Sequence, residues 1–231
     1  DEGHRTLSPF HPFTFSPFSP FHPSPFHFLI PFQDRVVPQT ILIAGGGTGG
    51  HLMPALAIAT RLRERCPEVE PVLVGAERGI EARILPTRDF RYHLLPAEPI
   101  YRRQWWKNLR WPFVAGRLIS RLSHLFAAEQ PLAVVGTGGY ASGPAVWFAT
   151  RRKLPTAIQE QNAYPGLVSR MLASRVRHIY LGLPEARARL KLGRATQLFD
   201  TGNPIPAPDP SRRPAALERF AGVRQQVDEH A

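Results

Sequence analysis

Short apolar runs alternate with amphipathic stretches along most of the chain, and this alternation predicts strands that are each followed by a helix. The apolar runs are typical of buried parallel strands, because both faces of such a strand are covered. The predicted strands are 41–44, 71–74, 92–95, 132–135, 156–158, 178–181 and 197–201. The predicted helices are 55–65, 80–85, 106–130, 145–152 and 167–175. We therefore predict an α/β fold with a doubly wound, Rossmann-like parallel sheet.

The two ends of the chain differ from this pattern. Residues 1–39 repeat Ser-Pro-Phe four times, and so much proline is incompatible with helix or central strand. We expect this segment to be extended or disordered, and we favour a spurious extension upstream of a true start near Val36 or Val37 over a Phe-rich docking tail. The α/β domain is predicted to span 40–206, and 207–231 is predicted to be a polar tail with one helix at 214–220.

Composition indicates the class of partner and excludes two structural features. The 231 residues carry a net charge of +11, which favours polyanionic partners such as nucleic acid, an acidic membrane surface or phosphorylated substrates. The single cysteine, Cys66, excludes an internal disulfide. No apolar run approaches the roughly 18 residues that a membrane-spanning helix needs.

A glycine-rich segment, Gly45 to Gly50, separates the first predicted strand from the first predicted helix. Glycine lets the backbone approach a ligand closely, and the N-terminus of a helix favours an anion. Gly45, Gly47 and Gly50 also satisfy the G-x-G-x-x-G pattern of dinucleotide-binding loops, so a dinucleotide-dependent oxidoreductase is an alternative. His51 favours a group-transfer enzyme, because a dinucleotide loop needs no titratable side chain there.

Two further unusual loops follow predicted strands, at 136–144 and at 160–162. Ligands of doubly wound sheets bind beyond the carboxyl ends of the strands, so we expect the three loops to converge on one crevice. Two facing helix N-termini can hold a diphosphate, and Thr48, Thr137 and Ser142 offer it hydroxyl groups. The amides of Gln161 and Asn162 can recognise sugar hydroxyls and acylamino groups.

The two candidate catalytic residues are His51 and Glu160. An imidazole titrates near neutral pH, so His51 suits a general base that accepts a proton from a hydroxyl nucleophile; a donor to phosphate is its alternative role. Glu160 is expected to orient or charge-tune His51 or to bind a substrate hydroxyl, unless it merely caps a helix.

The stretch 100–113 interleaves aromatic and basic residues. Tryptophan prefers the headgroup level of a bilayer and cations pair with anionic lipids, so we predict a membrane contact. Burial in the core is the first alternative; nucleic-acid binding is less favoured, because the aromatics are confined to one stretch. The predicted membrane residues are Arg102, Arg103, Trp105, Trp106, Lys107, Arg110 and Trp111.

Four motifs, at 46–51, 136–144, 160–162 and 201–204, occur in the order and spacing of one family. The chain resembles the MurG family of peptidoglycan glycosyltransferases. This resemblance implies the N-terminal domain of a GT-B enzyme, peripheral on the cytoplasmic face of the bacterial inner membrane. It implies transfer of N-acetylglucosamine from UDP-N-acetylglucosamine, with inversion, to the C4 hydroxyl of the MurNAc-pentapeptide carried by undecaprenyl diphosphate (lipid I).

The resemblance also implies roles for individual residues. His51 matches the base proposed for the family. Positions that match contacts to the donor sugar are Thr48, Gly49, Gly50 and Asn162. The glycine loops match the segments that receive the acceptor diphosphate, here Gly46, Gly47, Gly138, Gly139, Tyr140 and Ser142. No cofactor is implied, and because the chain has no Asp-x-Asp motif we expect a metal-free site.

The chain departs from the family pattern at two positions and in its length. Gln159 stands where the family usually has histidine, and Ile205-Pro206 stands where it has a donor-contacting arginine. The second, UDP-binding domain is not found after 201–204, so we expect an acceptor-side fragment that is inactive alone. A non-catalytic or split-subunit membrane-binding half, which recruits a separate donor-binding subunit, is the alternative function.

Overall fold

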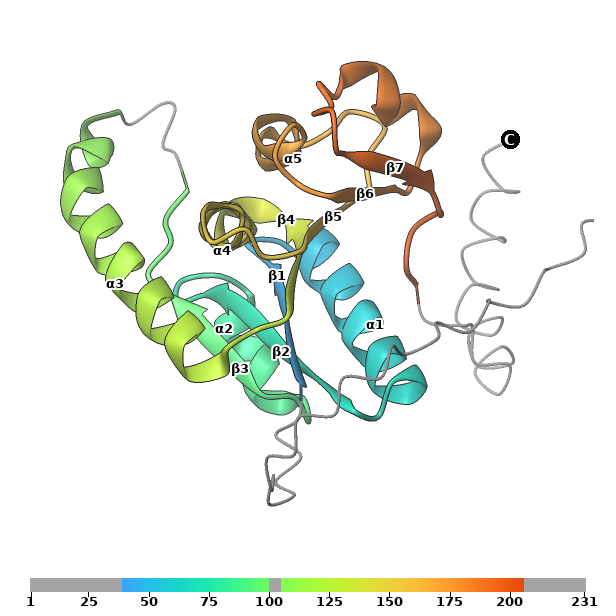
Figure 1. The fold of residues 1–231 in the computed structure, drawn as a ribbon. Helices are drawn as coiled ribbons and strands as arrows, with labels where there is room; N and C mark the ends of the chain where they lie inside the picture. Colours follow the sequence, from blue (N-terminus) through green and yellow to red (C-terminus); the bar gives the residue numbers. More distant parts are fainter. Residues whose placement is uncertain (1–38, 100–104, 206–231) are drawn as a thin grey trace, which may run out of the picture. The chain divides into compact units, whose positions relative to one another are not determined.

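The computed structural model describes residues 39–99 and 105–205, which form one seven-stranded, all-parallel sheet (Figure 1). Its strands are β1 (Gln39–Gly45), β2 (Val69–Ala76), β3 (Tyr92–Leu95), β4 (Ala133–Gly138), β5 (Thr156–Glu160), β6 (His178–Leu181) and β7 (Gln197–Asp200). Their spatial order is β3-β2-β1-β4-β5-β6-β7, so the chain reverses direction across the sheet between β1 and β4. Ligands of doubly wound sheets bind at this switch point. The predicted fold class is confirmed.

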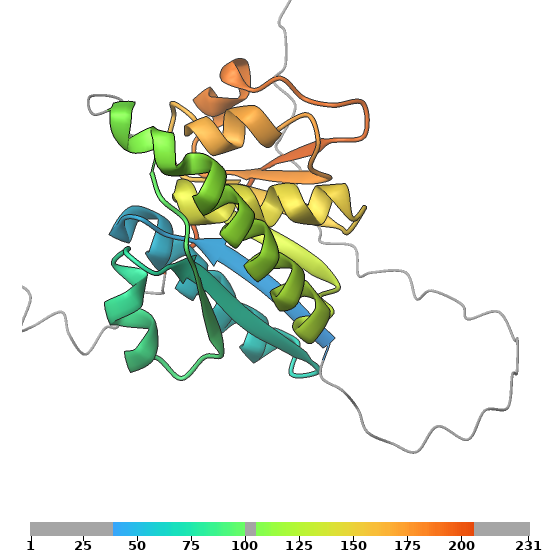
Figure 2. The ribbon, with the colours of Figure 1, turned by 90° about the vertical axis from the view of Figure 1, so that its left-hand side faces the viewer.

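Helices cover both faces of the sheet. The α-helices are α1 (Gly49–Arg65), α2 (Glu81–Ile84), α3 (Trp111–Glu129), α4 (Gly139–Arg151) and α5 (Leu167–Leu172). Short 3-10 helices are η1 (Leu85–Thr87), η2 (Trp105–Arg110) and η3 (Pro184–Arg189). Figure 1 shows α1 on one side of β1 with α3 and α4 on the other, and Figure 2 shows α3 and α4 in front of the sheet.

The central strand β1 divides its side chains between the two faces. Leu42 and Ala44 belong to the core beneath α3 and α4, whereas Ile43 packs with Leu52 of α1. All three strand residues are fully buried. A strand that is covered on both faces has no polar side to expose, which explains why β1 is a continuous apolar run.

Two helices begin earlier than the sequence pattern predicts. Helix α1 starts at Gly49 and not at 55, and α4 starts at Gly139 and not at 145. In each helix a proline, Pro54 or Pro144, is the sixth residue, where it removes one backbone hydrogen-bond donor without ending the helix. His51 therefore lies in the first turn of α1, so its backbone is held by a regular helix and not by a loop.

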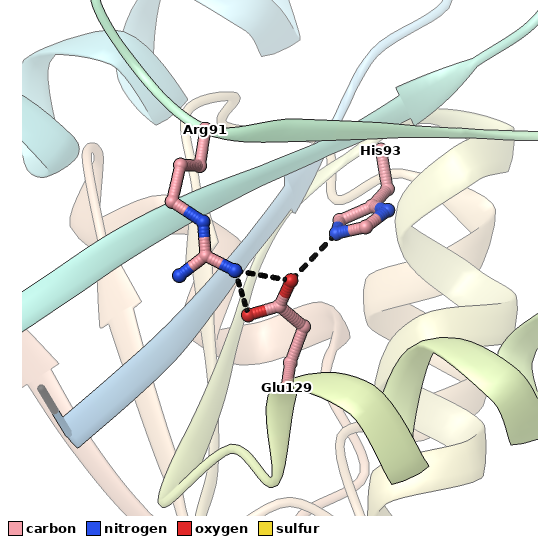
Figure 3. Close-up of polar contacts among 3 residues, drawn as sticks. All are labelled: Arg91, His93 and Glu129. Carbon is pink, nitrogen blue, oxygen red and sulfur yellow. Dashed lines mark hydrogen bonds and ion pairs between the residues drawn. The ribbon is translucent and has the colours of Figure 1, made fainter. Parts of the chain in front are cut away.

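An ion-pair cluster fixes the C-terminal end of α3 to the sheet (Figure 3). Both carboxyl oxygens of Glu129 lie 2.7 Å from Nη2 of Arg91, and one lies 2.7 Å from Nε2 of His93 in β3. The Glu129 side chain is only 4% exposed, while its two partners are 53% and 40% exposed. The cluster thus anchors a helix that forms one wall of the candidate site.

Replacing Glu129 with alanine is expected to lower the free energy of unfolding by about 1–3 kcal/mol, measured by urea denaturation. The variant removes a buried acceptor of charged hydrogen bonds, but Arg91 and His93 can then be hydrated. Glu64→Ala is the matched control, because Glu64 pairs with Arg61 on the exposed surface of α1. That change is expected to cost about 0.5 kcal/mol or less, and equal effects of the two variants would contradict an anchoring role.

Candidate active site

The first two glycine loops contact each other at the switch point between β1 and β4. The N–H of Gly46 donates to the carbonyl oxygen of Gly138 at 3.2 Å. Gly139 has a φ of +79°, and a Cβ there would overlap the Gly46 carbonyl. These contacts confirm that the two loops converge, and they require glycine at position 139.

A buried residue that the sequence analysis missed binds the backbone of the first loop. Glu81, at the start of α2, is completely buried, and its carboxyl group accepts a hydrogen bond from the N–H of Gly47. Its other oxygen has no hydrogen-bond partner within the described residues. The glycines at 46 and 79 leave the space that this carboxyl group occupies.

Gly46 and Gly47 are two of the positions expected to receive a diphosphate, but their N–H groups are not free to bind it. Both groups already donate within the protein, to Gly138 and to Glu81. The first turn of α1 is different, because the leading N–H groups of a helix have no partner within the helix. Gly49 and Gly50 provide such groups, and a Cβ at Gly49 would meet no atom within 4 Å.

The second loop provides the start of α4 and an aromatic cover for the first loop. The Tyr140 ring lies against Gly47, where an added Cβ would come within 2.6 Å of the ring. Ser142 and Thr137 are both fully buried, and the Thr137 hydroxyl donates to the carbonyl oxygen of His51 at 2.8 Å. The Ser142 hydroxyl has no hydrogen-bond partner within the described residues, and its predicted contact with a phosphate stays a prediction, as does that of Thr137.

The imidazole of His51 is oriented by two oxygen acceptors. Its Nδ1 lies 3.1 Å from the carbonyl oxygen of Thr137 and 3.3 Å from Oε1 of Gln161. The amide nitrogen of Gln161 donates to the same carbonyl at 2.7 Å, which turns its oxygen toward the imidazole. Because both neighbours accept, Nδ1 carries the proton in the neutral ring, and Nε2 keeps the lone pair that a general base needs.

Glu160 makes no hydrogen bond or ion pair with His51. Its carboxyl oxygens accept from the backbone and side-chain nitrogens of Asn162, both at 3.0 Å, and from the N–H of Gly166 at 2.9 Å. With a side chain that is almost fully buried, Glu160 shapes the loop that leads into α5. This arrangement corrects the prediction that Glu160 orients the base, because Gln161 occupies that position.

A pocket of about 580 Å³ extends from His51 between α3, α4 and α5. Most of its lining is apolar, and several large side chains remain exposed, including Met171 at 63% and Ile119 at 46%. The polar lining includes His51, Glu98 and Glu160. The site therefore joins a candidate base to an apolar cavity.

Part of the aromatic and basic stretch 100–113 lines this pocket. Trp111 lines the pocket, whereas Trp106 is 54% exposed and Phe113 is 85% exposed. Core burial therefore does not describe Trp106. Arg110 lies 3.5 Å from Glu98. Arg102 and Arg103 lie outside the described residues, as do the side chains of Trp105 and Lys107.

The fourth motif returns the chain to the site after β7. The side-chain oxygen of Asn203 accepts from Gln159 at 3.3 Å, and its amide nitrogen donates to the carbonyl oxygen of Gln161 at 3.4 Å. Among the described residues, no group of three or more His, Cys, Asp or Glu side chains is arranged to hold a metal ion. None of the helices at 39–99 and 105–205 is long and apolar enough to cross a membrane.

Comparison with known proteins identifies relatives that match 71% of the chain. Two are named UDP-N-acetylglucosamine–N-acetylmuramyl-(pentapeptide) pyrophosphoryl-undecaprenol N-acetylglucosamine transferase. The one from Carboxydothermus hydrogenoformans is 46% identical over 165 residues, which are 71% of this chain and 44% of that protein. The one from Moorella thermoacetica is 40% identical over the same shares. The chain thus spans less than half the length of these relatives.

Solved structures agree with the sequence comparison. MurG of Acinetobacter baumannii superposes with a TM-score of 0.58 at 25% identity, covering 74% of this chain and 47% of that one. UDP-N-acetylglucosamine 2-epimerase from Rickettsia bellii shares the fold alone, at 18% identity and a TM-score of 0.51 over 80% of this chain and 47% of that one. The model of the glycosyltransferase family 28 N-terminal domain matches residues 41–181. The chain therefore belongs to glycosyltransferase family 28 and not to the dinucleotide-dependent oxidoreductases.

Proposed function

We propose that this chain forms the acceptor side of an enzyme that transfers N-acetylglucosamine from UDP-N-acetylglucosamine to lipid I. The observation that carries the proposal is the position of His51. Its ring is held through Nδ1 where the two glycine loops meet, and it borders the apolar pocket. The names of the relatives from Carboxydothermus hydrogenoformans and Moorella thermoacetica support this choice of donor and acceptor.

In the proposed reaction, Nε2 of His51 accepts the proton of the acceptor C4 hydroxyl. The hydroxyl oxygen forms a bond to the anomeric carbon of N-acetylglucosamine from the face opposite UDP. The bond between that carbon and the diphosphate oxygen breaks, and UDP leaves with the electron pair. The configuration at the anomeric carbon is thereby inverted. Holding the base in one tautomer keeps its lone pair available for this proton transfer.

We assign the two helix N-termini to the two substrates. The first turn of α1, with Thr48, Gly49 and Gly50, faces the donor sugar, together with Asn162. The start of α4, at Gly138 and Gly139, receives the acceptor diphosphate with Tyr140. Each helix N-terminus favours an anion by about 0.3–1 kcal/mol, and by more where water is excluded.

The apolar pocket and its exposed rim are proposed to face the lipid. An acceptor on a polyprenyl chain leaves the membrane only in part, so its enzyme must lie against the bilayer. The exposed Trp106 and Phe113, with Arg110 nearby, are suited to the headgroup region. We propose peripheral attachment to the anionic cytoplasmic face of a bacterial inner membrane, and we expect no nucleic-acid partner.

The test is a set of transfer assays with labelled UDP-N-acetylglucosamine and a lipid I analogue. In a hybrid, residues 40–205 replace the matched segment of the Carboxydothermus hydrogenoformans relative. We expect the hybrid to transfer the sugar, and the 231-residue chain is assayed in parallel. A folded hybrid without transfer, beside an active unmodified relative, would contradict the proposal. Transfer that appears when the chain is mixed with the separate remainder of that relative would favour the split-subunit alternative.

A further inference from the structure

A row of three side-chain amides lies behind His51. Oε1 of Gln161 accepts from Nδ1 of the imidazole at 3.3 Å, and Nε2 of Gln161 donates to Oε1 of Gln159. Nε2 of Gln159 donates in turn to Oδ1 of Asn203 at 3.3 Å. Gln159 is only 3% exposed, so its amide has little access to water as an alternative partner.

The hydrogen bonds of this row all run in one direction. Within the row, each amide accepts from the neighbour on the side of His51 and donates to the neighbour on the side of Asn203. Gln161 Nε2 also donates to the carbonyl oxygen of Thr137 at 2.7 Å, and Asn203 closes the network on the carbonyl oxygen of Gln161 at 3.4 Å. If the Gln161 amide turned over, its NH₂ group would face Nδ1, which would then have to accept. The imidazole proton would move to Nε2, and the lone pair of the base would be lost.

We propose that Gln161 is a positioning residue that holds His51 in the Nδ1–H tautomer, and that Gln159 and Asn203, together with the Thr137 carbonyl, hold the Gln161 amide in the required orientation. The segment 201–204, where the chain leaves the last strand, is thereby coupled to the base. The importance of this tautomer for transfer rests on the proposed function, but the tautomer itself can be measured without any transfer.

The carbonyl oxygen of Thr137 is the competing explanation. It accepts from both His51 and Gln161, and as a backbone group it remains in every variant. If it alone fixed the tautomer, loss of the Gln161 side chain would change nothing at the imidazole. The two explanations therefore predict different results for one substitution.

The experiment records long-range ¹H–¹⁵N correlations of the imidazoles in the 231-residue chain, with the His51 signals assigned by their loss in His51→Asn. We expect a pyrrole-type Nδ1 and a pyridine-type Nε2 in the unchanged protein. Gln161→Leu is expected to populate the opposite tautomer. Gln161→Glu, which keeps an acceptor at this position, is expected to retain the original tautomer. Gln197→Leu, at an exposed glutamine that begins β7, is the control and is expected to change nothing.

Asn203→Ala is expected to shift the tautomer in the same direction as Gln161→Leu, and by less. A backbone ¹H–¹⁵N spectrum confirms that each variant is folded. An unchanged tautomer in folded Gln161→Leu would overturn the proposal in favour of Thr137 alone. If the tautomer shifts as expected while a His51→Ala hybrid keeps its transfer activity, the positioning role stands and the proposed function fails. The reverse pair of results would leave the function and remove the positioning role.

Discussion

Replacing His51 with alanine is expected to lower kcat/KM for sugar transfer by about 10²–10⁴-fold, the usual contribution of a general base. The effect should fall on kcat more than on KM, because the imidazole acts on the proton that moves in the transition state. The measurement is steady-state transfer by the hybrid enzyme, with UDP-N-acetylglucosamine and the lipid I analogue varied in turn.

His51→Asn is the companion variant, because asparagine keeps a side-chain N–H that can donate to the Thr137 carbonyl but has no basic nitrogen. It should fold like the unchanged chain and lose activity to the same extent as His51→Ala. Activity of a folded His51→Asn enzyme within about threefold of the unchanged hybrid would exclude His51 as the base.

Gly139→Ala is expected to lower the free energy of unfolding by about 2–4 kcal/mol and to abolish transfer. The new Cβ would overlap the Gly46 carbonyl, and alanine at a φ of +79° costs a further 1–2 kcal/mol or so. The two glycine loops would have to separate. His51 would also move, because its imidazole packs closely against the second loop: a Cβ added at the neighbouring Gly138 would lie 2.5 Å from Nδ1. Urea denaturation and the transfer assay measure the two effects.

Gly49→Ala is the matched control for this packing argument. Nothing lies within 4 Å of an added Cβ there, and the residue begins α1, so stability should be unchanged or slightly higher. Transfer should nevertheless fall if the donor sugar approaches this backbone. Equal losses of stability in the two variants would contradict the close contact between the loops.

The fold could be predicted from the sequence because its strands are buried on both sides. The apolar runs of β1 and β2 have no alternation that could be confused with an exposed sheet, and the helices between them require parallel pairing. The order of the strands was not contained in that pattern. It depends on the return of the chain from β3 to β4 beside β1, a tertiary feature.

The starts of α1 and α4 were predicted too late for a common reason. Glycine and proline have low helix propensity, so the segments around Pro54 and Pro144 looked like loops. In the structure, the hydrogen bond between Gly46 and Gly138 fixes both loops. Helices α1 and α4 begin within the next three residues of the chain, at Gly49 and Gly139. Tertiary packing outweighs propensity at these two positions.

The site was predicted in its position but only partly in its contacts. His51 and the two glycine loops were found because glycines and a histidine after buried strands are visible in sequence. The role of Glu81 was missed, since its carboxyl group reaches Gly47 across 34 residues of sequence. Gln161 was given a sugar-binding role, and Glu160 was expected to orient or charge-tune the base, to bind a substrate hydroxyl or to cap a helix. Sequence order does not reveal which of two neighbouring side chains points toward the imidazole.

The most direct test of the account is a ¹H–¹⁵N titration of the 231-residue chain with a lipid I analogue that carries a short prenyl chain. We expect the largest shifts at Gly138 and Gly139 and at the His51 imidazole, with smaller shifts along the pocket walls of α3 and α5. Inorganic diphosphate should shift the signals at the start of α4 but leave those of the pocket walls unchanged. Saturable shifts confined to residues away from the glycine loops and the pocket would contradict an acceptor site at the junction of β1 and β4.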